Sequence, residues 1–287
     1  MYRSKRNRSC VRSRRGAPDL SDRADLDAGA DAPYYLPSGG EVALFEQCHA
    51  RQLAVMLKGP TGCGKTRFVE YMAWRLGRPL ITISCHDDLS ASDLVGRFLI
   101  GQGGTEWHDG PLTRAVREGA ICYLDEVVEA RQDTVVVLHP LSDHRRMLPI
   151  DKTGETLPAA PGFQLVVSYN PGYQRMLKDM KPSTRQRFVA LDFAFPSHEQ
   201  ETAIVERESG AGYSLAHSLV TLGHRLRALQ DRGLAEVPST RLLIACARLV
   251  AGGIEVHQAC YAAIVAPLSD EASLVAAMRD LVDASFV

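Results

Sequence analysis

The chain has 287 residues, of which 45% are hydrophobic and 23% are charged, and its formal net charge is -1. This composition indicates an ordinary globular protein with enough apolar material for one large domain and a smaller one. A net charge this close to zero gives the molecule no overall field for a nucleic-acid backbone, so the sequence does not favour a nucleic-acid partner.

No apolar run approaches the roughly 20 residues that are needed to cross a bilayer. The first residues carry basic side chains without the apolar stretch of a signal peptide. The seven cysteines are scattered and form no C-x-x-C pair, which is typical of reduced thiols. We therefore expect a cytoplasmic protein that has no membrane partner.

Residues 1–32 show almost no apolar periodicity and change from a basic run to an acidic one. Such a segment cannot bury enough surface to offset its ordering entropy. We expect a disordered charged tail, and the alternative is an arm that binds nucleic acid or a partner protein.

From Pro33 onward, short apolar runs alternate with helical patterns. Five of these runs are strand candidates, namely residues 53–58, 80–84, 120–124, 163–168 and 189–195. Between the first two, Phe68, Met72 and Leu76 recur at helical spacing in residues 65–76. Strands that alternate with helices predict an α/β domain over residues 33–197, with a parallel five-stranded sheet between helices.

After Pro196 the strand pattern stops and helical patterns continue to the C-terminus. A row of leucines falls on one helical face: Leu215, Leu219, Leu222, Leu226 and Leu229. Pro238 and Ser239 then open another helix, as a stop followed by an N-cap. We expect residues 198–287 to form a small helical domain.

The strongest motif lies between the first predicted strand and the first predicted helix. It matches G-x-x-x-x-G-K-[ST] with the residues Gly59, Pro60, Thr61, Gly62, Cys63, Gly64, Lys65 and Thr66. The glycines let successive N–H groups point at phosphate oxygens, and the helix adds its positive dipole end. We expect Lys65 to neutralise the β- and γ-phosphates of ATP and the Thr66 hydroxyl to bind Mg²⁺.

The apolar run 120–124 is followed directly by Asp125 and Glu126. Carboxylates at the end of a buried strand are costly unless a metal or a hydrogen-bond network compensates them. Downstream of a phosphate-binding loop, Asp125 is expected to hold Mg²⁺ through its water shell. Glu126 is expected to polarise the attacking water.

Three further polar residues stand next to the last two predicted strands. Asn170 ends one strand, where its amide is placed to bond the γ-phosphate or to orient the water, although Asn-Pro is also a common turn former. Arg185 and Arg187 precede the last strand. Either one is a candidate arginine finger for a neighbouring subunit or a surface ion-pair partner.

Taken in order, these residues resemble the AAA+ superfamily of ATPases over essentially everything from Pro33 to the C-terminus. By that resemblance, Asp125 and Glu126 are the Walker B pair and Asn170 is sensor 1. Arg187, which directly precedes a Phe, matches the arginine finger better than Arg185 does. The run Ser239-Thr240-Arg241 is similar to sensor 2, which implies that Arg241 contacts the γ-phosphate from the helical lid of the same subunit.

Finer motifs resemble the CbbQ/NorQ/NirQ branch of the MoxR group. They are the runs 34–39, 59–70, 107–112 and 183–188. This resemblance implies a homo-hexameric chaperone-type motor that works with a von Willebrand factor A-domain partner. The favoured client is rubisco, from which a CbbQ-type machine ejects inhibitory sugar phosphates. The alternative is maturation of nitric oxide or nitrite reductase.

Two rivals come from other functional classes. A DNA-directed AAA+ motor is supported only by the basic tail. A small-molecule kinase would need no Asn170, Arg187 or Arg241.

Two insertions are expected in the α/β domain. Residues 94–104 contain several glycines around Phe98 and predict a flexible loop with an apolar tip. Residues 139–162 predict a hairpin with a turn near Lys152. In the family that the chain resembles, such insertions face the central pore or the client, and the alternative for each is an ordinary surface hairpin.

Overall fold

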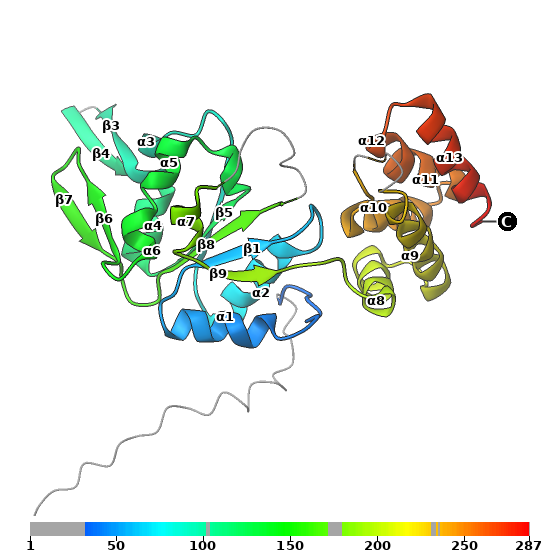
Figure 1. The fold of residues 1–287 in the computed structure, drawn as a ribbon, viewed down its shortest axis with the longest axis horizontal. Helices are drawn as coiled ribbons and strands as arrows, with labels where there is room; N and C mark the ends of the chain where they lie inside the picture. Colours follow the sequence, from blue (N-terminus) through cyan, green and yellow to red (C-terminus); the bar gives the residue numbers. More distant parts are fainter. Residues whose placement is uncertain (1–31, 102–103, 172–179, 231–233, 235, 287) are drawn as a thin grey trace, which may run out of the picture. The chain divides into compact units, whose positions relative to one another are not determined.

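The computed structural model describes residues 32–101, 104–171, 180–230, 234 and 236–286. Its main sheet is parallel and has five strands in the order β2-β5-β8-β1-β9 (Figure 1). The strands are β1 (Val55–Lys58), β2 (Leu80–Ser84), β5 (Ile121–Asp125), β8 (Gln164–Tyr169) and β9 (Val189–Asp192). The predicted fold class is confirmed. The tail predicted over residues 1–32 lies, apart from Ala32, outside the described residues.

Helices cover the sheet because its strands are apolar on both faces. They are α1 (Glu41–Ala50), α2 (Lys65–Leu76), α3 (Ala91–Val95), α4 (Pro111–Glu118), the 3₁₀ turn η2 (Val127–Glu129), α5 (Gln132–Val136), α6 (His139–Ser142) and α7 (Pro182–Arg185). Successive side chains of a strand point to opposite faces. In β1, Val55 and Leu57 pack in one cluster with Phe68 of α2, and Met56 packs in another with Val116 of α4. The sheet is therefore the middle layer of three.

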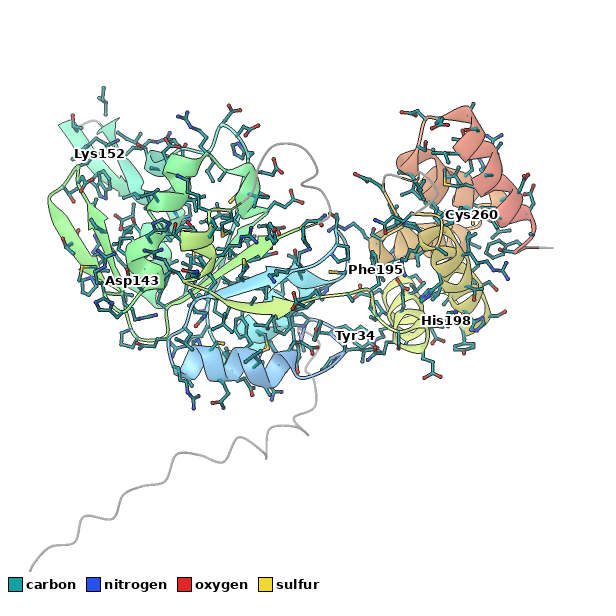
Figure 2. The ribbon with its side chains drawn as sticks, in the orientation of Figure 1. Tyr34, Asp143, Lys152, Phe195, His198 and Cys260 are labelled. Atoms are coloured by element: carbon teal, nitrogen blue, oxygen red, sulfur yellow. The ribbon has the colours of Figure 1, made fainter. Side chains whose placement is uncertain are left out.

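Two antiparallel hairpins extend the α/β part. Strands β3 (Gly96–Gly101) and β4 (Gly104–Asp109) form the first, so the prediction of a flexible loop over 94–104 is wrong and the alternative of a hairpin holds. The glycines suggested a loop, but Phe98 and Trp107 stand opposite each other, and their rings lie 5.2 Å apart in an edge-to-face contact. The predicted second hairpin is confirmed as β6 (Met147–Ile150) and β7 (Glu155–Pro158), and Lys152 lies in its turn (Figure 2).

The rest of the described chain is helical. Its elements are α8 (His198–Ser209), α9 (Tyr213–Arg227), α10 (Thr240–Ala251), α11 (Val256–Cys260), the π-helix η4 (Tyr261–Val265), α12 (Ala266–Leu268) and α13 (Ala272–Asp283). Leu219, Leu222 and Leu226 of α9 are fully buried, as the leucine row predicts. The Ser239 side chain accepts a hydrogen bond from the N–H of Leu242 and caps α10 as expected. Among the described helices, none is long and apolar enough to span a bilayer.

Candidate active site

The phosphate-binding loop connects the end of β1 to the start of α2. Gly64 caps α2 in the left-handed conformation, with φ at 101°, which an L side chain rarely adopts. Gly59 lies close to Phe193, the residue that follows β9. A Cβ on Gly59 would come within 2.3 Å of the Phe193 carbonyl oxygen. The two glycines therefore allow the tight turn and the close approach that the loop needs.

Lys65 is buried, with 9% of the residue exposed, and its ammonium group turns back into the loop. It donates hydrogen bonds of 2.8 Å to the carbonyl oxygens of Gly59 and Pro60. Its alkyl stem lies in the protein while the charge stays at the concave side of the loop. Phosphate oxygens are stronger acceptors for an ammonium group than neutral carbonyl oxygens, so the loop is suited to a polyphosphate.

The Asp125 carboxylate ends β5 and is held by two hydroxyl groups. Its Oδ1 atom accepts a hydrogen bond of 2.7 Å from Tyr123 and one of 2.5 Å from Ser168. The Tyr123 hydroxyl also lies 3.5 Å from the Thr66 hydroxyl. Tyr123 and Ser168 were not predicted from the sequence. A weak signal existed for Tyr123, since it stands two residues before Asp125 and so faces the same side of its strand.

Glu126 is exposed and stands in the left-handed region, with φ at 55° and ψ at 49°. Its N–H donates a hydrogen bond of 2.8 Å to the Ser168 hydroxyl oxygen. Non-glycine residues rarely adopt this conformation in proteins overall. Those that do are enriched at functional sites.

Burial and the carboxylates of Asp125 and Glu126 change the pKa values of nearby side chains. Burial, followed by the negative charge of Asp125, raises the pKa of Tyr123, so its hydroxyl stays protonated and remains a donor. Burial, together with Asp125 and Glu126, raises the pKa of Cys85 to about 12. Burial also raises the pKa of Cys63 in the loop. Both thiols are therefore neutral at physiological pH, which makes them weak nucleophiles.

A cavity of about 570 Å³ joins most of the predicted site residues. Its lining includes the loop from Thr61 to Thr66, Asp125, Glu126, Asn170 and Arg241. The Asn170 amide donates a hydrogen bond of 3.0 Å to the Thr61 hydroxyl. Arg241 is exposed near the start of α10 and brings a cation to the same space. The cavity thus combines backbone donors with four cationic side chains and four carboxylates, which come from Lys65, Arg67, Arg241 and Arg248 and from Glu70, Asp125, Glu126 and Glu208.

Another part of the lining is apolar and aromatic. Tyr34, Tyr35 and Leu36 precede α1, and Ile204 and Ile244 come from α8 and α10. Apolar walls beside a phosphate-binding loop suit the heterocyclic base of a nucleotide.

The two candidate finger arginines do not line this cavity. Arg185 donates from Nε to the Met180 carbonyl oxygen at 3.0 Å, and Arg187 donates to the Ser183 carbonyl oxygen. These two arginines lie on and just after α7. Gly59 and Pro60 of the predicted loop are not part of the lining either, but their carbonyl oxygens accept hydrogen bonds from Lys65, which does line the cavity. The other predicted site residues all line the cavity.

The oxygen donors next to the loop fit Mg²⁺. The hydroxyl of Thr66 and the carboxylate of Asp125 are hard oxygen ligands, and no hydrogen bond within the described part of the chain reaches the second oxygen of Asp125. In the same part of the chain, no group of three or more His, Cys, Asp or Glu residues forms a metal cage. Mg²⁺ in phosphate-transfer sites typically uses one or two protein ligands together with the substrate phosphates.

Comparison with known proteins agrees with this geometry. Residues 54–188 match the AAA domain model of the dynein-related subfamily, and residues 201–285 match the model of the CbbQ/NirQ/NorQ C-terminal region. Protein NorQ of Paracoccus denitrificans (strain Pd 1222) is 59% identical over 91% of this chain and 96% of its own length. The chain belongs to the CbbQ/NirQ/NorQ family of MoxR-type AAA+ ATPases.

Other relatives in this family are similarly close. The denitrification regulatory protein NirQ of Stutzerimonas stutzeri is 60% identical over 89% of this chain and 93% of its own. Protein CbbQ of Hydrogenophilus thermoluteolus is 56% identical over 86% of this chain and 92% of its own. As a member of the CbbQ/NirQ/NorQ family, the chain is an ATP hydrolase.

Among solved structures, the Holliday junction branch migration motor RuvB of Thermotoga maritima aligns with a TM-score of 0.51 at 14% identity. The alignment covers 84% of this chain and 67% of the RuvB chain. This likeness supports the AAA+ fold of the CbbQ/NirQ/NorQ family member.

Proposed function

We propose that this ATPase uses the energy of ATP hydrolysis to remodel a client protein, with residues 33–197 as the nucleotide-binding domain and residues 198–287 as the lid. The observation that carries the proposal is the single cavity that is lined by the phosphate-binding loop, Asp125, Glu126, Asn170 and Arg241. A simple phosphate-binding fold would need only the first of these.

Each residue of the cavity receives a role from its position. The loop from Gly59 to Thr66 binds the phosphates, and Lys65 exchanges its bonds to loop carbonyl oxygens for bonds to phosphate oxygens. Thr66 and Asp125 would hold Mg²⁺, which neutralises charge on the phosphates when it is bound. Glu126, which is exposed to the cavity, polarises the attacking water.

Two further residues of the lining, Asn170 and Arg241, contact the γ-phosphate. Asn170 approaches it from just past the end of β8, and Arg241 approaches it from α10. Arg187, with Arg185 as the reserve, completes the pocket of the neighbouring subunit in a homo-hexamer. Closure and opening of the lid then convert each hydrolysis event into motion.

Two clients are proposed, each with a von Willebrand factor A-domain partner. The sequence motifs placed rubisco first, and the 56% identity to a protein named CbbQ supports it. The identities of 59% and 60% to proteins named NorQ and NirQ, one of them called a denitrification regulatory protein, support a nitric oxide or nitrite reductase. We propose both on equal terms.

One experiment separates these clients. The purified ATPase, its A-domain partner and Mg-ATP are incubated either with sugar-phosphate-inhibited rubisco or with an immature nitrogen-oxide reductase. Recovery of activity in one arm identifies the client, and the Glu126→Gln variant serves as the control that binds ATP without hydrolysing it. Recovery in neither arm would contradict both clients. ATPase stimulation by DNA that is lost at higher salt would favour a DNA motor instead.

A further inference from the structure

We propose that Ser168 is a positioning residue for ATP hydrolysis, because its one hydroxyl group fixes Asp125 and Glu126 together. The inference rests on the proposed roles of these two acidic residues. Ser168 also belongs to the lining of the cavity, and the role inferred for it is to hold these two residues rather than to bind the nucleotide.

The Ser168 hydroxyl donates to one acidic residue and accepts from the other. The Ser168 proton is donated to Oδ1 of Asp125 at 2.5 Å, since an ionised carboxylate can only accept. An oxygen lone pair then accepts the N–H of Glu126 at 2.8 Å. The direction of each bond is therefore fixed by chemistry, and neither bond can reverse.

The location of Ser168 makes this link rigid. The residue is fully buried on β8, which lies between β5 and β1 in the sheet. It is thus held next to the end of the strand that carries Asp125. Two residues after Ser168, just past the end of β8, comes Asn170, which also lines the cavity.

The bond to Glu126 has a specific consequence for its backbone. Glu126 adopts φ 55° and ψ 49°, a conformation that L side chains disfavour because of contacts with their own Cβ. The Ser168 oxygen accepts a hydrogen bond from the N–H group of Glu126. This bond stabilises the turn that orients the Glu126 carboxylate. Without the hydroxyl, the turn loses a partner that helps to hold it in this region.

Tyr123 provides an internal comparison. Its hydroxyl donates to the same Oδ1 atom of Asp125 at 2.7 Å and lies 3.5 Å from the Thr66 hydroxyl, but it forms no hydrogen bond with Glu126. Removing the Tyr123 hydroxyl should disturb Asp125 and its surroundings near Thr66 but leave the Glu126 turn intact. Removing the Ser168 hydroxyl should disturb both acidic residues.

The test compares Ser168→Ala with Tyr123→Phe in the full-length protein. For each variant, kcat and KM for ATP are measured at saturating Mg²⁺. The Mg²⁺ concentration that gives half-maximal binding of a fluorescent ATP analogue is measured separately. The exposed Thr82 on β2 of the same sheet gives the matched control, Thr82→Ala.

We expect Ser168→Ala to lower kcat by about 10- to 100-fold, the range that is typical for groups that orient ligands of a metal site. Its KM for ATP should stay unchanged, and more Mg²⁺ should be needed for binding. Tyr123→Phe should also need more Mg²⁺, and at saturating Mg²⁺ its kcat should fall clearly less than that of Ser168→Ala. Ser168→Thr, which retains the hydroxyl, should restore kcat. If the alanine variant does not fold, Ser168→Cys keeps the volume with a weak donor and should show the same pattern.

A wild-type kcat for Ser168→Ala, or equal effects of the two variants on both quantities, would overturn the inference. The proposed function has its own check in Glu126→Gln. If Glu126→Gln is inactive and Ser168→Ala is normal, only the positioning role fails. If Glu126→Gln still hydrolyses ATP, the assigned role of Glu126 fails as well.

Discussion

The guanidinium group of Arg227 donates two hydrogen bonds of 2.7 Å to the carboxylate of Glu201, one to each oxygen. Glu201 is completely buried in α8, and the side chain of Arg227 is only 12% exposed in α9. Thr240, the first residue of α10, donates its hydroxyl to the same carboxylate at 2.6 Å. The pair therefore ties three helices together directly beside Arg241.

The same arginine also contacts the segment that leads into the helical part. Its guanidinium carbon lies 3.8 Å from the centre of the Phe195 ring, and its Nε donates to the Pro238 carbonyl oxygen at 2.9 Å. Phe195 belongs to the connection between β9 and α8 (Figure 2). Arg227 thus joins this connection to the start of α10.

Removing the carboxylate should strongly destabilise the protein. Glu201→Ala leaves Arg227 buried without its counter-charge, and such a loss typically costs about 3–5 kcal/mol of unfolding free energy. Chemical denaturation of the variant measures this loss. The matched control is Glu199→Ala, an exposed glutamate on the same helix, which should be close to neutral. Equal stability of the two variants would contradict the structural role of the pair.

Removing the Lys65 ammonium group should weaken ATP binding. A hydrogen bond to a charged group contributes about 1.5–3 kcal/mol, so Lys65→Ala should bind ATP at least about tenfold more weakly. Titration with a fluorescent ATP analogue measures the affinity. Lys58→Ala is the control, because Lys58 ends β1 and pairs with the exposed Asp192 outside the loop. Wild-type affinity of Lys65→Ala would rule out this residue as a phosphate ligand.

The finger role of Arg187 predicts a defect that acts between subunits. Arg187→Ala should bind ATP normally and lose hydrolysis, since the residue lies outside the cavity of its own chain. Finger arginines in related phosphate-transfer enzymes contribute about 10³–10⁵ in rate. The same measurement on Arg185→Ala decides between the two arginines.

A mixing experiment makes that prediction sharper. Lys65→Ala protomers do not hydrolyse ATP but still offer Arg187 to a neighbour, and Arg187→Ala protomers still bind ATP. Mixed rings of the two inactive variants should therefore regain part of the activity. If every mixture stays inactive, Arg187 does not act across a subunit boundary.

Stability should decrease below neutral pH through His49. Burial, followed by the positive charge of Arg78, lowers the pKa of His49 below its usual 6.5, and its Nδ1 atom is buried without a hydrogen bond in the described part of the chain. The folded protein then binds fewer protons than the unfolded one, so this stability is complete above pH 6.5 and is lost as the pH falls below it. The difference between the melting temperatures at neutral and mildly acidic pH should become smaller in His49→Gln, while His139 and His198, whose pKa values are also lowered by burial, keep part of it. The difference should keep its full size in the control His86→Gln, whose imidazole is exposed. An unchanged pH dependence in His49→Gln would exclude this residue as the cause.

Much of this molecule follows from short-range sequence patterns. The helix predicted over residues 65–76 begins and ends where α2 does, because a motif fixes its start and a glycine, Gly77, ends it in the left-handed conformation. The five strands were found because each is a short apolar run between turns. The left-handed backbone of Glu126 was not predictable, because nothing in the residue type favours it.

The hydrogen bond from Ser168 to Asp125 could not be predicted from the sequence either. Ser168 lies 43 positions away, and only the pairing of β5 with β8 brings it into hydrogen-bonding distance. Likewise, the β3–β4 hairpin depends on a cross-strand contact between Phe98 and Trp107, whereas the local glycines indicated a loop. Contacts of this kind come from tertiary pairing, which local periodicity does not report.

The strand order also governs how the chain can fold during synthesis. Strand β1 emerges early, yet Val55 pairs with Val166 on one side and with Val189 on the other. The sheet therefore cannot be completed until its edge strand β9 has left the ribosome, and β1 keeps an unpaired apolar edge until then. Because such distant pairings are slow to form, truncation before Val189 should yield an aggregating fragment rather than a smaller folded unit.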